Sequence, residues 1–452
     1  MPKKDFQPIP NPYKLPVNQT ESKLHRTLGP IHLWGIAVGL VISGDYFGWN
    51  FGWSVARFWE FAIAVGIIAI FYICFALCFT ELASSIPHAS GPSAYADAAL
   101  GRWGGFISGY FVLCEFALAP PAIASALGGY FHFLIPIIPV FWASFGFFIL
   151  LVLVNLFGVK QTARFELFVT VVAVIGLLIY LGALLPYFSF SKFPKWLGFD
   201  SLSLSELFES IPFAIWFFLA VEGVAMAAEE VKNPKRDIPL GYALGIGTLI
   251  FLACSVFVVT AGVVPTIEIS ELEYPLSYVL TKYYGSESII TKIFTFIGLF
   301  GLIASLFGIL LGYSRLVYAL SVTNFLPRFL SQIERKRLVP RNAVLSGGVI
   351  GIICLLIGNT AELITASALG ACGMYLISMV SYFILKKNEP HRDRPYKAPF
   401  YPVLPGIALI LGLVAFFAVA YSNPFVASLV GGGFLASVIL YSFTYHYRKN
   451  IP

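Results

Sequence analysis

The sequence predicts an all-α integral membrane protein with about twelve membrane-spanning helices, and three observations lead to this fold class. First, hydrophobic residues make up 58% of the 452 residues and charged residues only 12%, against about 25% charged residues in soluble domains. Second, apolar runs of about 20 residues, each long enough to cross a bilayer, recur along the whole chain. Third, basic residues gather between alternate pairs of these runs. A mean hydropathy of +0.83 excludes a soluble multidomain enzyme.

The expected spans form two units of five and a final pair. The units cover residues 30–187 and 207–385, the pair covers 403–445, and residues 1–29 form a polar N-terminal tail. The twelve spans are expected at Pro30–Val55, Phe61–Ser84, Trp103–Phe131, Pro136–Phe157, Phe165–Tyr187, Leu207–Ala228, Leu240–Val264, Thr291–Val322, Ala343–Ile357, Leu363–Leu385, Val403–Tyr421 and Pro424–Tyr445.

The distribution of Lys and Arg predicts the orientation of the chain. With the N-terminus inside, 23 of the 29 basic residues fall on the inner side and five on the outer side, and Arg315 lies near the inner end of the eighth span. Cytoplasmic loops carry the excess of basic residues in membrane proteins. We therefore expect a multi-pass protein of the cell membrane, inner or plasma, with both termini in the cytoplasm. The tail lacks the apolar region of a signal peptide.

The sequence lacks the motifs of an enzyme or a metalloprotein. Its six Cys lie inside apolar runs without CxxC spacing, and its six His are scattered, which argues against a metal site. It contains no phosphate-binding loop, dinucleotide fingerprint or nucleophile elbow. We therefore expect no enzymatic activity, no cofactor and no nucleic-acid partner, with the lipid bilayer as the surroundings of the protein.

The first span contains residues that a lipid-facing helix does not tolerate. Gly44 and Gly48 flank Asp45, with Tyr46 and Trp49 beside it. Glycine costs about 1 kcal/mol in a helix interior, and a carboxylate at bilayer depth costs about 2.5–3.5 kcal/mol on insertion scales. We expect the helix to break here, around a cavity that protein walls off from lipid.

The sixth span repeats this combination of an acid and a glycine. Glu222 precedes Gly223, and Pro212 bends the outer half of the same span. Interruptions at equivalent places in two halves of a chain indicate an inverted-repeat transporter with a site at the membrane midplane. Asp45 and Glu222 would then belong to one site. The alternative is that each carboxylate only stabilises a neighbouring broken helix.

A third acid, Glu115, lies in the third span, a few residues before Pro120 and Pro121. It faces the same cavity or packs in protonated form against another helix, and the sequence leaves both open. Since a buried carboxyl can hold its proton at neutral pH, each of the three acids is also a candidate proton carrier.

The sign of the charge predicts the class of substrate. Acids at both breaks would repel the carboxylate of an amino acid and attract its ammonium, whereas a substrate that is only a cation avoids this conflict. Aromatic rings bind desolvated ammonium groups, and Tyr46, Trp49 and Trp216 lie close to the two breaks in the sequence. We therefore expect a small organic cation.

Four stretches resemble the amino acid–polyamine–organocation (APC) superfamily. They are Glu81–Tyr110, Glu229–Pro239 (EEVKNPKRDIP), Ser314–Pro327 and Arg394–Pro405 (RPYKAPFYPVLP). The resemblance runs from the first span to the twelfth. It implies the LeuT-type fold, which has two inverted repeats of five helices, interrupted first and sixth spans, and two further helices.

Within the superfamily, GDYFGWN in the first span resembles ethanolamine permeases, because amino acid members usually have a short GSG-like break where this chain has Gly44-Asp45-Tyr46. The resemblance implies an ethanolamine permease that works by alternating access between spans one, three, six and eight. By similarity to arginine/agmatine antiporters, Trp216 and Phe307 gate the site, and Ala117 and Leu118 line it. The predicted substrate-binding residues are Gly44, Asp45, Tyr46, Trp49, Glu115, Ala117, Leu118, Trp216, Ala220, Glu222, Gly223 and Phe307.

The coupling ion and the rival functions stay open. Where proton-coupled amino acid members place a lysine in the fifth span, this chain has Ala173. Proton coupling through Asp45, Glu115 or Glu222, exchange and facilitated diffusion are all compatible with the sequence, whereas Ser305 alone is weak support for sodium. The main alternative is an amino acid or polyamine permease of the same fold. A channel or receptor is more remote, since no continuous polar stripe or signalling domain is present.

Overall fold

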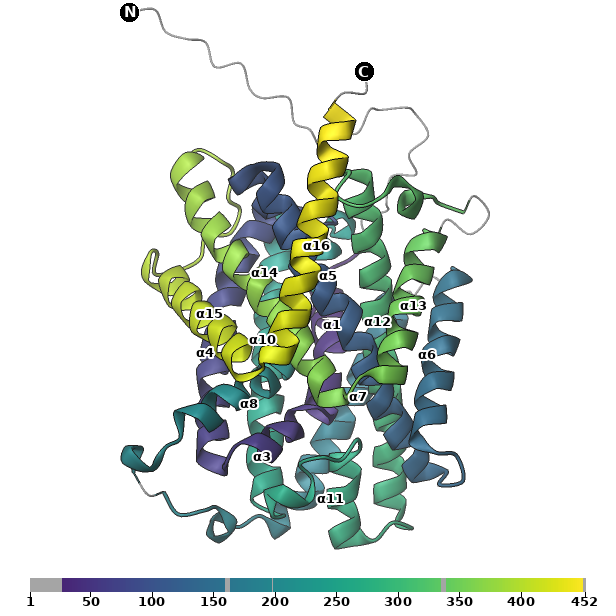
Figure 1. Cartoon of the computed structure of the whole chain (residues 1–452). Coiled ribbons are helices and arrows are strands. Elements are labelled where there is room, and N and C mark those ends of the chain that lie inside the picture. The colour runs from purple at the N-terminus through teal and green to yellow at the C-terminus, as the bar shows by residue number, and fades with distance from the viewer. Residues whose placement is uncertain (1–26, 159–162, 197, 335–338, 450–452) are drawn as a thin grey trace, which may run out of the picture.

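The computed structural model describes residues 27–158, 163–196, 198–334 and 339–449, and these residues form a bundle of helices (Figure 1). Within them the chain has no β-sheet, only the isolated bridges Leu28–Val231 and Glu334–Val339. The predicted N-terminal tail lies outside the described residues except for its last three positions, and so does Lys160. The all-α fold class is confirmed.

In the described part of the chain, eight helices are long and apolar enough to cross a membrane. They are α4 (Phe58–Ser85), α5 (Pro92–Leu134), α7 (Ala163–Leu184), α10 (Pro234–Ala261), α12 (Ile289–Val322), α14 (Thr360–Asn388), α15 (Val403–Ser422) and α16 (Pro424–Lys449). Two further apolar helices of 17 residues, α6 (Val140–Leu156) and α13 (Arg341–Ile357), match the fourth and ninth expected spans. The two remaining expected spans are the interrupted ones. A short helix, α11 (Pro275–Tyr284), was not expected.

The first span is divided into four pieces, but the main break follows Asp45 instead of surrounding it. The pieces are α1 (Pro30–Val41), α2 (Ser43–Tyr46), η1 (Trp49–Phe51) and α3 (Gly52–Val55). Helical backbone continues through Ile42 (φ −59°, ψ −22°) and ends at Phe47 (φ −165°, ψ 159°). Gly48 then adopts φ 96°, a left-handed conformation that glycine tolerates. Asp45 therefore lies in a helical turn just before the break.

The sixth span is broken between α8 (Leu204–Trp216) and α9 (Gly223–Met226). In the segment between them Ala220 has φ 73°. A non-glycine residue in this region of the backbone is uncommon, and such strain gathers at functional sites. A short 3-10 helix, η5 (Ala228–Glu230), follows α9.

Glycines allow the two broken spans to pack directly on each other. A β-carbon at Gly44 would lie 2.3 Å from the Trp216 carbonyl oxygen, and one at Gly48 would lie 2.2 Å from the Trp216 indole nitrogen. A β-carbon at Gly223 would lie 2.6 Å from Cδ1 of Leu40. Any side chain at these positions would push the broken spans apart, so the glycines set the close approach of the first and sixth spans.

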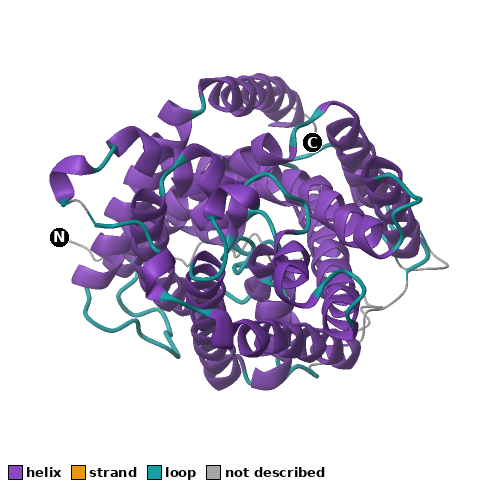
Figure 2. Cartoon of the chain, turned by 90° about the horizontal axis from the view of Figure 1, so that it is seen from below, coloured by secondary structure: helices purple, strands orange, loops and turns teal. Residues whose placement is uncertain are grey.

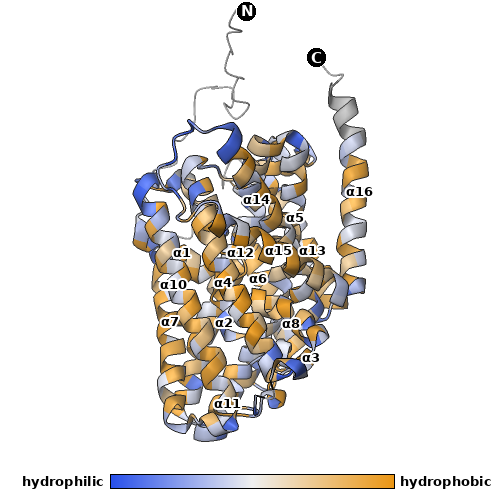
Figure 3. Cartoon of the chain, turned by 90° about the vertical axis from the view of Figure 1, so that its left-hand side faces the viewer, coloured by the Kyte–Doolittle hydropathy of each residue, from blue (hydrophilic) through white to orange (hydrophobic). Residues whose placement is uncertain are grey.

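The bundle has two ends, and apolar residues dominate between them (Figure 3). We call the end where α1 begins and α16 finishes the terminal end, and the opposite end, with α3 and α11, the α11 end (Figure 1). At the terminal end the start of the first span meets the end of the sixth, because the Thr27 N–H donates to the Glu230 carbonyl over 3.0 Å and the Lys232 N–H to the Leu28 carbonyl over 2.9 Å. Figure 2 views the bundle from the α11 end, along most of its helices.

The loop between α10 and α11 packs over the α11 end of the bundle. Asn50 Nδ2 donates to the carbonyls of Ile269 and Leu272 over 2.7 and 3.0 Å, which fastens this loop to the first span. Further along the loop, Glu273 lies against Gly129 of α5. Its Oε1 accepts a hydrogen bond of 2.9 Å from Thr360, and its Oε2 is buried without a partner.

We expect Glu273→Gln to stabilise the protein at pH 8 but not at pH 5. Burial raises the pKa of Glu273 from 4.5 to about 7. An acid whose pKa is raised on folding binds its proton more tightly in the folded state, so stability falls as pH rises from 4.5 to 7 and stays lower above that. The loss is at most about 3 kcal/mol. Thermal unfolding of the wild type and of Glu273→Gln in detergent, at pH 5 and at pH 8, measures this loss. An equal change in stability at the two pH values would contradict the raised pKa of Glu273.

Candidate functional site

Two fully buried acids from different spans lie side by side where the sixth span is broken. Glu115 of α5 and Glu222, which immediately precedes α9, are both 0% exposed, and their carboxyl groups are close enough to interact. Glu115 Oε1 accepts a hydrogen bond of 3.1 Å from the backbone N–H of Ala220. We call Glu115 and Glu222 the carboxyl pair. The strained backbone at Ala220 thus aims an amide at the pair.

Three residues that the sequence did not single out support the carboxyl pair. Tyr375 of α14 donates its hydroxyl to Glu222 Oε2 over 3.4 Å, and the hydroxyl of Tyr72 on α4 lies 2.8 Å from that of Tyr375. The Ser367 hydroxyl donates to the backbone carbonyl of Glu115 over 2.9 Å. Among 23 tyrosines, nothing in the sequence distinguishes these two, so only the packing of α4 on α14 reveals them.

The carboxyl pair is not neutralised by the protein. Among the described residues, no Lys or Arg forms an ion pair with Glu115 or Glu222. Glu115 Oε2 and Glu222 Oε1 have no hydrogen-bond partner. Two buried carboxyl groups this close cannot both be ionised at low cost. The arrangement is therefore suited to receive a cation or to hold a proton.

Asp45, the residue on which the sequence prediction depended most, lies apart from the carboxyl pair. It is 0% exposed, and both of its carboxyl oxygens lack a partner. Tyr46 on the same turn and Cys254 of α10 lie close to its carboxyl group. The turn α2 packs against α10 and α12. The structure thus brings Glu115 and Glu222 together and does not bring Asp45 to them.

Tyr46 and Trp49 secure the broken first span to its neighbours. The Tyr46 hydroxyl donates to the Ala173 carbonyl over 2.7 Å, and its ring stacks on Phe294. Trp49 donates its indole N–H to the Asp45 carbonyl over 3.2 Å and stacks on Phe217. Both side chains therefore serve the packing of the break, and their contact with a ligand stays a prediction.

The predicted gate residues occupy different environments. Trp216 is 2% exposed and donates its indole N–H to the Phe47 carbonyl over 2.9 Å, so it joins the two breaks directly. Phe307 of α12 is 8% exposed and belongs to the core. Ala117 and Leu118 of α5 are half-buried and pack against that core. None of these four residues lines the large cavity described next.

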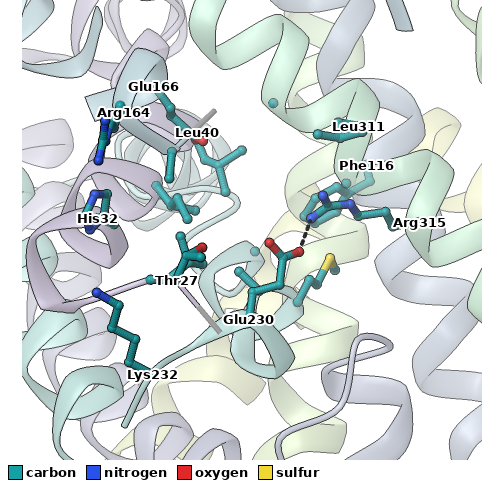
Figure 4. A pocket seen from close by; sticks show the side chains of 18 residues that line it. Thr27, His32, Leu40, Phe116, Arg164, Glu166, Glu230, Lys232, Leu311 and Arg315 are labelled. Carbon is teal, nitrogen blue, oxygen red and sulfur yellow. Dashed lines mark ion pairs between the residues drawn. The ribbon is translucent and has the colours of Figure 1, made fainter. Parts of the chain in front are cut away.

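A cavity of about 780 Å³ lies at the terminal end, and its lining includes Thr27, His32, Glu230 and Arg315 (Figure 4). Its mouth carries the ion pair between Arg315 and Glu230, 3.6 Å apart. Its lining includes Leu40, Phe116 and Gly223, and the last two directly follow the acids of the carboxyl pair in the chain. A Leu40 methyl packs on Gly223. A thin apolar layer thus separates the pair from the cavity.

The opposite side of the site is sealed by aromatic rings. Besides the bond from Trp216 to Phe47, Trp49 packs edge-on to Trp53 and lies next to Phe257, with centroid distances of 4.8 and 6.0 Å. The site is therefore closed on both sides, toward the cavity by a thin apolar layer and toward the α11 end by aromatic rings. A buried polar site with an open cavity on one side only is the arrangement expected of one state of an alternating-access cycle.

The known proteins that this chain resembles are named as transporters or permeases. A sequence model described as amino acid permease matches residues 28–444. An uncharacterized transporter of Rhizobium meliloti (strain 1021) is 27% identical, covering 88% of this chain and 87% of the relative. A branched-chain amino acid permease of Bacillus subtilis (strain 168) is 24% identical, covering 87% and 88%. A methylthioribose transporter of the same organism is 27% identical, covering 86% and 88%. None of these three is named for ethanolamine.

Proposed function

Because the chain belongs to the amino acid permease family, we propose that it is a membrane permease for a small organic amine without a carboxylate, most specifically ethanolamine. Glu115 and Glu222 would receive the ammonium group. This assignment moves the ammonium from Asp45, which the sequence favoured, to the carboxyl pair. The reason is that Phe116 and Gly223, which directly follow the two acids in the chain, line the cavity, whereas the turn that carries Asp45 packs against α10 and α12.

The observation that carries this proposal is the hydrogen bond from the Ala220 N–H to Glu115. In transporters with broken helices, exposed backbone amides at a break bind the carboxylate of the substrate. Here Glu115 supplies a carboxylate from the protein to such an amide. A substrate carboxylate would have to displace it and approach a second acid, Glu222. An amine with a neutral tail meets neither obstacle.

The family favours a second candidate, a permease for amino acids or polyamines. The relative named for branched-chain amino acids supports it. The relative named for methylthioribose shows that relatives at this level of sequence identity are not all named for amino acids. The two candidates differ in one requirement, since an amino acid needs a free amide or a cation for its carboxylate, and the carboxyl pair offers neither.

Transport would follow an alternating-access cycle in which the described conformation faces the cytoplasm. Lys232, Arg315 and Arg341 lie at the terminal end, and basic residues favour the cytoplasmic side. The terminal end is therefore assigned to the cytoplasm of a cell that holds the permease in its plasma or inner membrane. Release of Trp216 from Phe47 would open the other side. A proton is the proposed coupling ion.

Counterflow in proteoliposomes tests the substrate class. Vesicles loaded with unlabelled ethanolamine should take up labelled ethanolamine through the purified protein. External ethanolamine and related amino alcohols should compete, while alanine, arginine and putrescine at the same concentration should not. Protein-free vesicles provide the baseline. Counterflow of labelled alanine or of a labelled branched-chain amino acid in vesicles loaded with the same amino acid, without any counterflow of ethanolamine, would replace this proposal by the amino acid alternative.

A further inference from the structure

We propose that Asp45 is a proton-binding site of its own, separate from the carboxyl pair, and that each amine is carried together with a proton bound there. The inference rests on the proposed function only in requiring that the chain transports a solute. It concerns how transport is driven, and it assigns a role to the acid that the substrate site does not use.

Among the described residues, the groups known to lie beside Asp45 are neutral hydroxyl and thiol side chains, and none is a cation. From its own turn it faces Tyr46, and from α10 it faces Cys254. The hydroxyl of Tyr46 is already bonded to the Ala173 carbonyl. Tyr130 of α5 packs edge-on to Tyr46 and donates its hydroxyl to the Tyr46 backbone carbonyl over 3.0 Å, and Tyr180 of α7 lies near Tyr130. In the described part of the chain, no Lys, Arg or His forms an ion pair with Asp45.

A proton suits this site better than a metal ion. An ionised carboxylate that is fully buried and unpaired is strongly disfavoured, and a proton removes the charge without further ligands. A metal ion needs several oxygen ligands, and the described residues contain no cluster of three His, Cys, Asp or Glu.

The position between the first and eighth spans, where sodium would be expected, is filled by direct hydrogen bonds. The Ser305 hydroxyl donates to the Leu40 carbonyl over 2.5 Å and lies 2.8 Å from the Ser43 hydroxyl. These contacts use the hydroxyl and carbonyl groups that a sodium ion would require.

The location of Asp45 connects the proton to the conformational cycle. Asp45 lies two residues before Phe47, whose carbonyl accepts the hydrogen bond of Trp216. In the described conformation the aromatic rings exclude water from this region, so the neutral form of Asp45 fits best. Opening toward the α11 end requires Trp216 to leave Phe47, which would admit water to the break and allow the proton to exchange on that side. A group with different proton affinity in two conformations couples the proton to their equilibrium.

Asp45→Asn tests the proposal, because an amide resembles the protonated carboxyl but cannot exchange a proton. We expect counterflow of ethanolamine to stay within about threefold of wild type. Accumulation driven by an inward proton gradient should fall to a tenth or less, and a pH dye inside the vesicles should no longer report proton entry with the amine. Accumulation near the wild-type level, or proton-free transport by the wild type, would overturn the proposal. Loss of counterflow would instead place Asp45 in the substrate site, which also contradicts it.

Two further variants keep the test decisive. Asp45→Thr provides a second neutral replacement if the amide fails to fold, and Asp45→Glu should retain proton entry because it keeps a titratable group. Each variant must elute as a monodisperse peak in size-exclusion chromatography, which shows that it is folded. Failure of the substrate proposal is recognised separately, since the wild type would then exchange an amino acid instead of ethanolamine, and the same measurements would be repeated with that solute.

Discussion

Glu115→Gln is expected to weaken ethanolamine transport by about 10- to 150-fold in KM while leaving the protein folded. The amide oxygen of glutamine can still accept the hydrogen bond from the Ala220 N–H, so the break should keep its shape. What is lost is the negative charge opposite the ammonium. A hydrogen bond to a charged group contributes about 1.5–3 kcal/mol, which corresponds to the stated range of affinity. Initial rates of labelled uptake across a range of ethanolamine concentrations measure the change.

A comparison of two Glu115 variants distinguishes two roles of this residue. One is its negative charge, and the other is its hydrogen bond to the Ala220 N–H. Glu115→Ala removes the charge and also leaves the Ala220 N–H without its partner, so this variant should gain competition by alanine that Glu115→Gln does not. Glu362→Gln, an exposed acid at the start of α14, is the matched control and should behave as wild type. Wild-type KM for ethanolamine in Glu115→Gln would remove Glu115 from the site.

The sequence could identify the acids of the site but not which of them meet. All three stand out because a carboxylate at membrane depth is costly. Their directions depend on helix rotation, which changes by 100° per residue. With the break at Phe47 and Gly48, helical α2 turns Gly44 toward Trp216 and its successor Asp45 toward α10. A break one turn earlier would have aimed Asp45 elsewhere, and the sequence does not fix that position within a glycine-rich stretch.

The fold was more predictable than the site because each membrane span is identified by properties summed over about 20 residues. Length and hydropathy place each span, and interruption of the sixth span follows from Glu222 and Gly223. The support that Tyr375 and Tyr72 give to the carboxyl pair has no such signal, since a tyrosine in a membrane helix resembles any other. The helix α11 has only ten residues, too few to cross a bilayer, so span length and hydropathy do not reveal it.

Glu81→Ala is expected to cost about 3–5 kcal/mol of stability, the usual loss when one partner of a buried ion pair is removed. Glu81, near the end of α4, is 1% exposed. Its carboxylate receives Lys386 Nζ at 2.6 Å, Arg394 Nε at 3.1 Å and the Ala398 N–H at 2.8 Å. The variant would leave two cations near a buried cavity with no counter-charge. Thermal or denaturant unfolding of the purified protein in detergent measures the loss.

The same cluster explains why two separate stretches carry the family resemblance at this end of the bundle. Glu81 opens the first of them and Arg394 opens the last, so one carboxylate binds α4 to the segment that follows α14. Glu389→Gln is the matched control, because its partner Arg392 lies three residues away and both side chains are more exposed, at 28% for Arg392 and 39% for Glu389. Such surface pairs contribute about 0–1 kcal/mol. Equal stability of the Glu81 and Glu389 variants would show that the cluster does not hold these segments together, and the two motifs would then need a separate explanation.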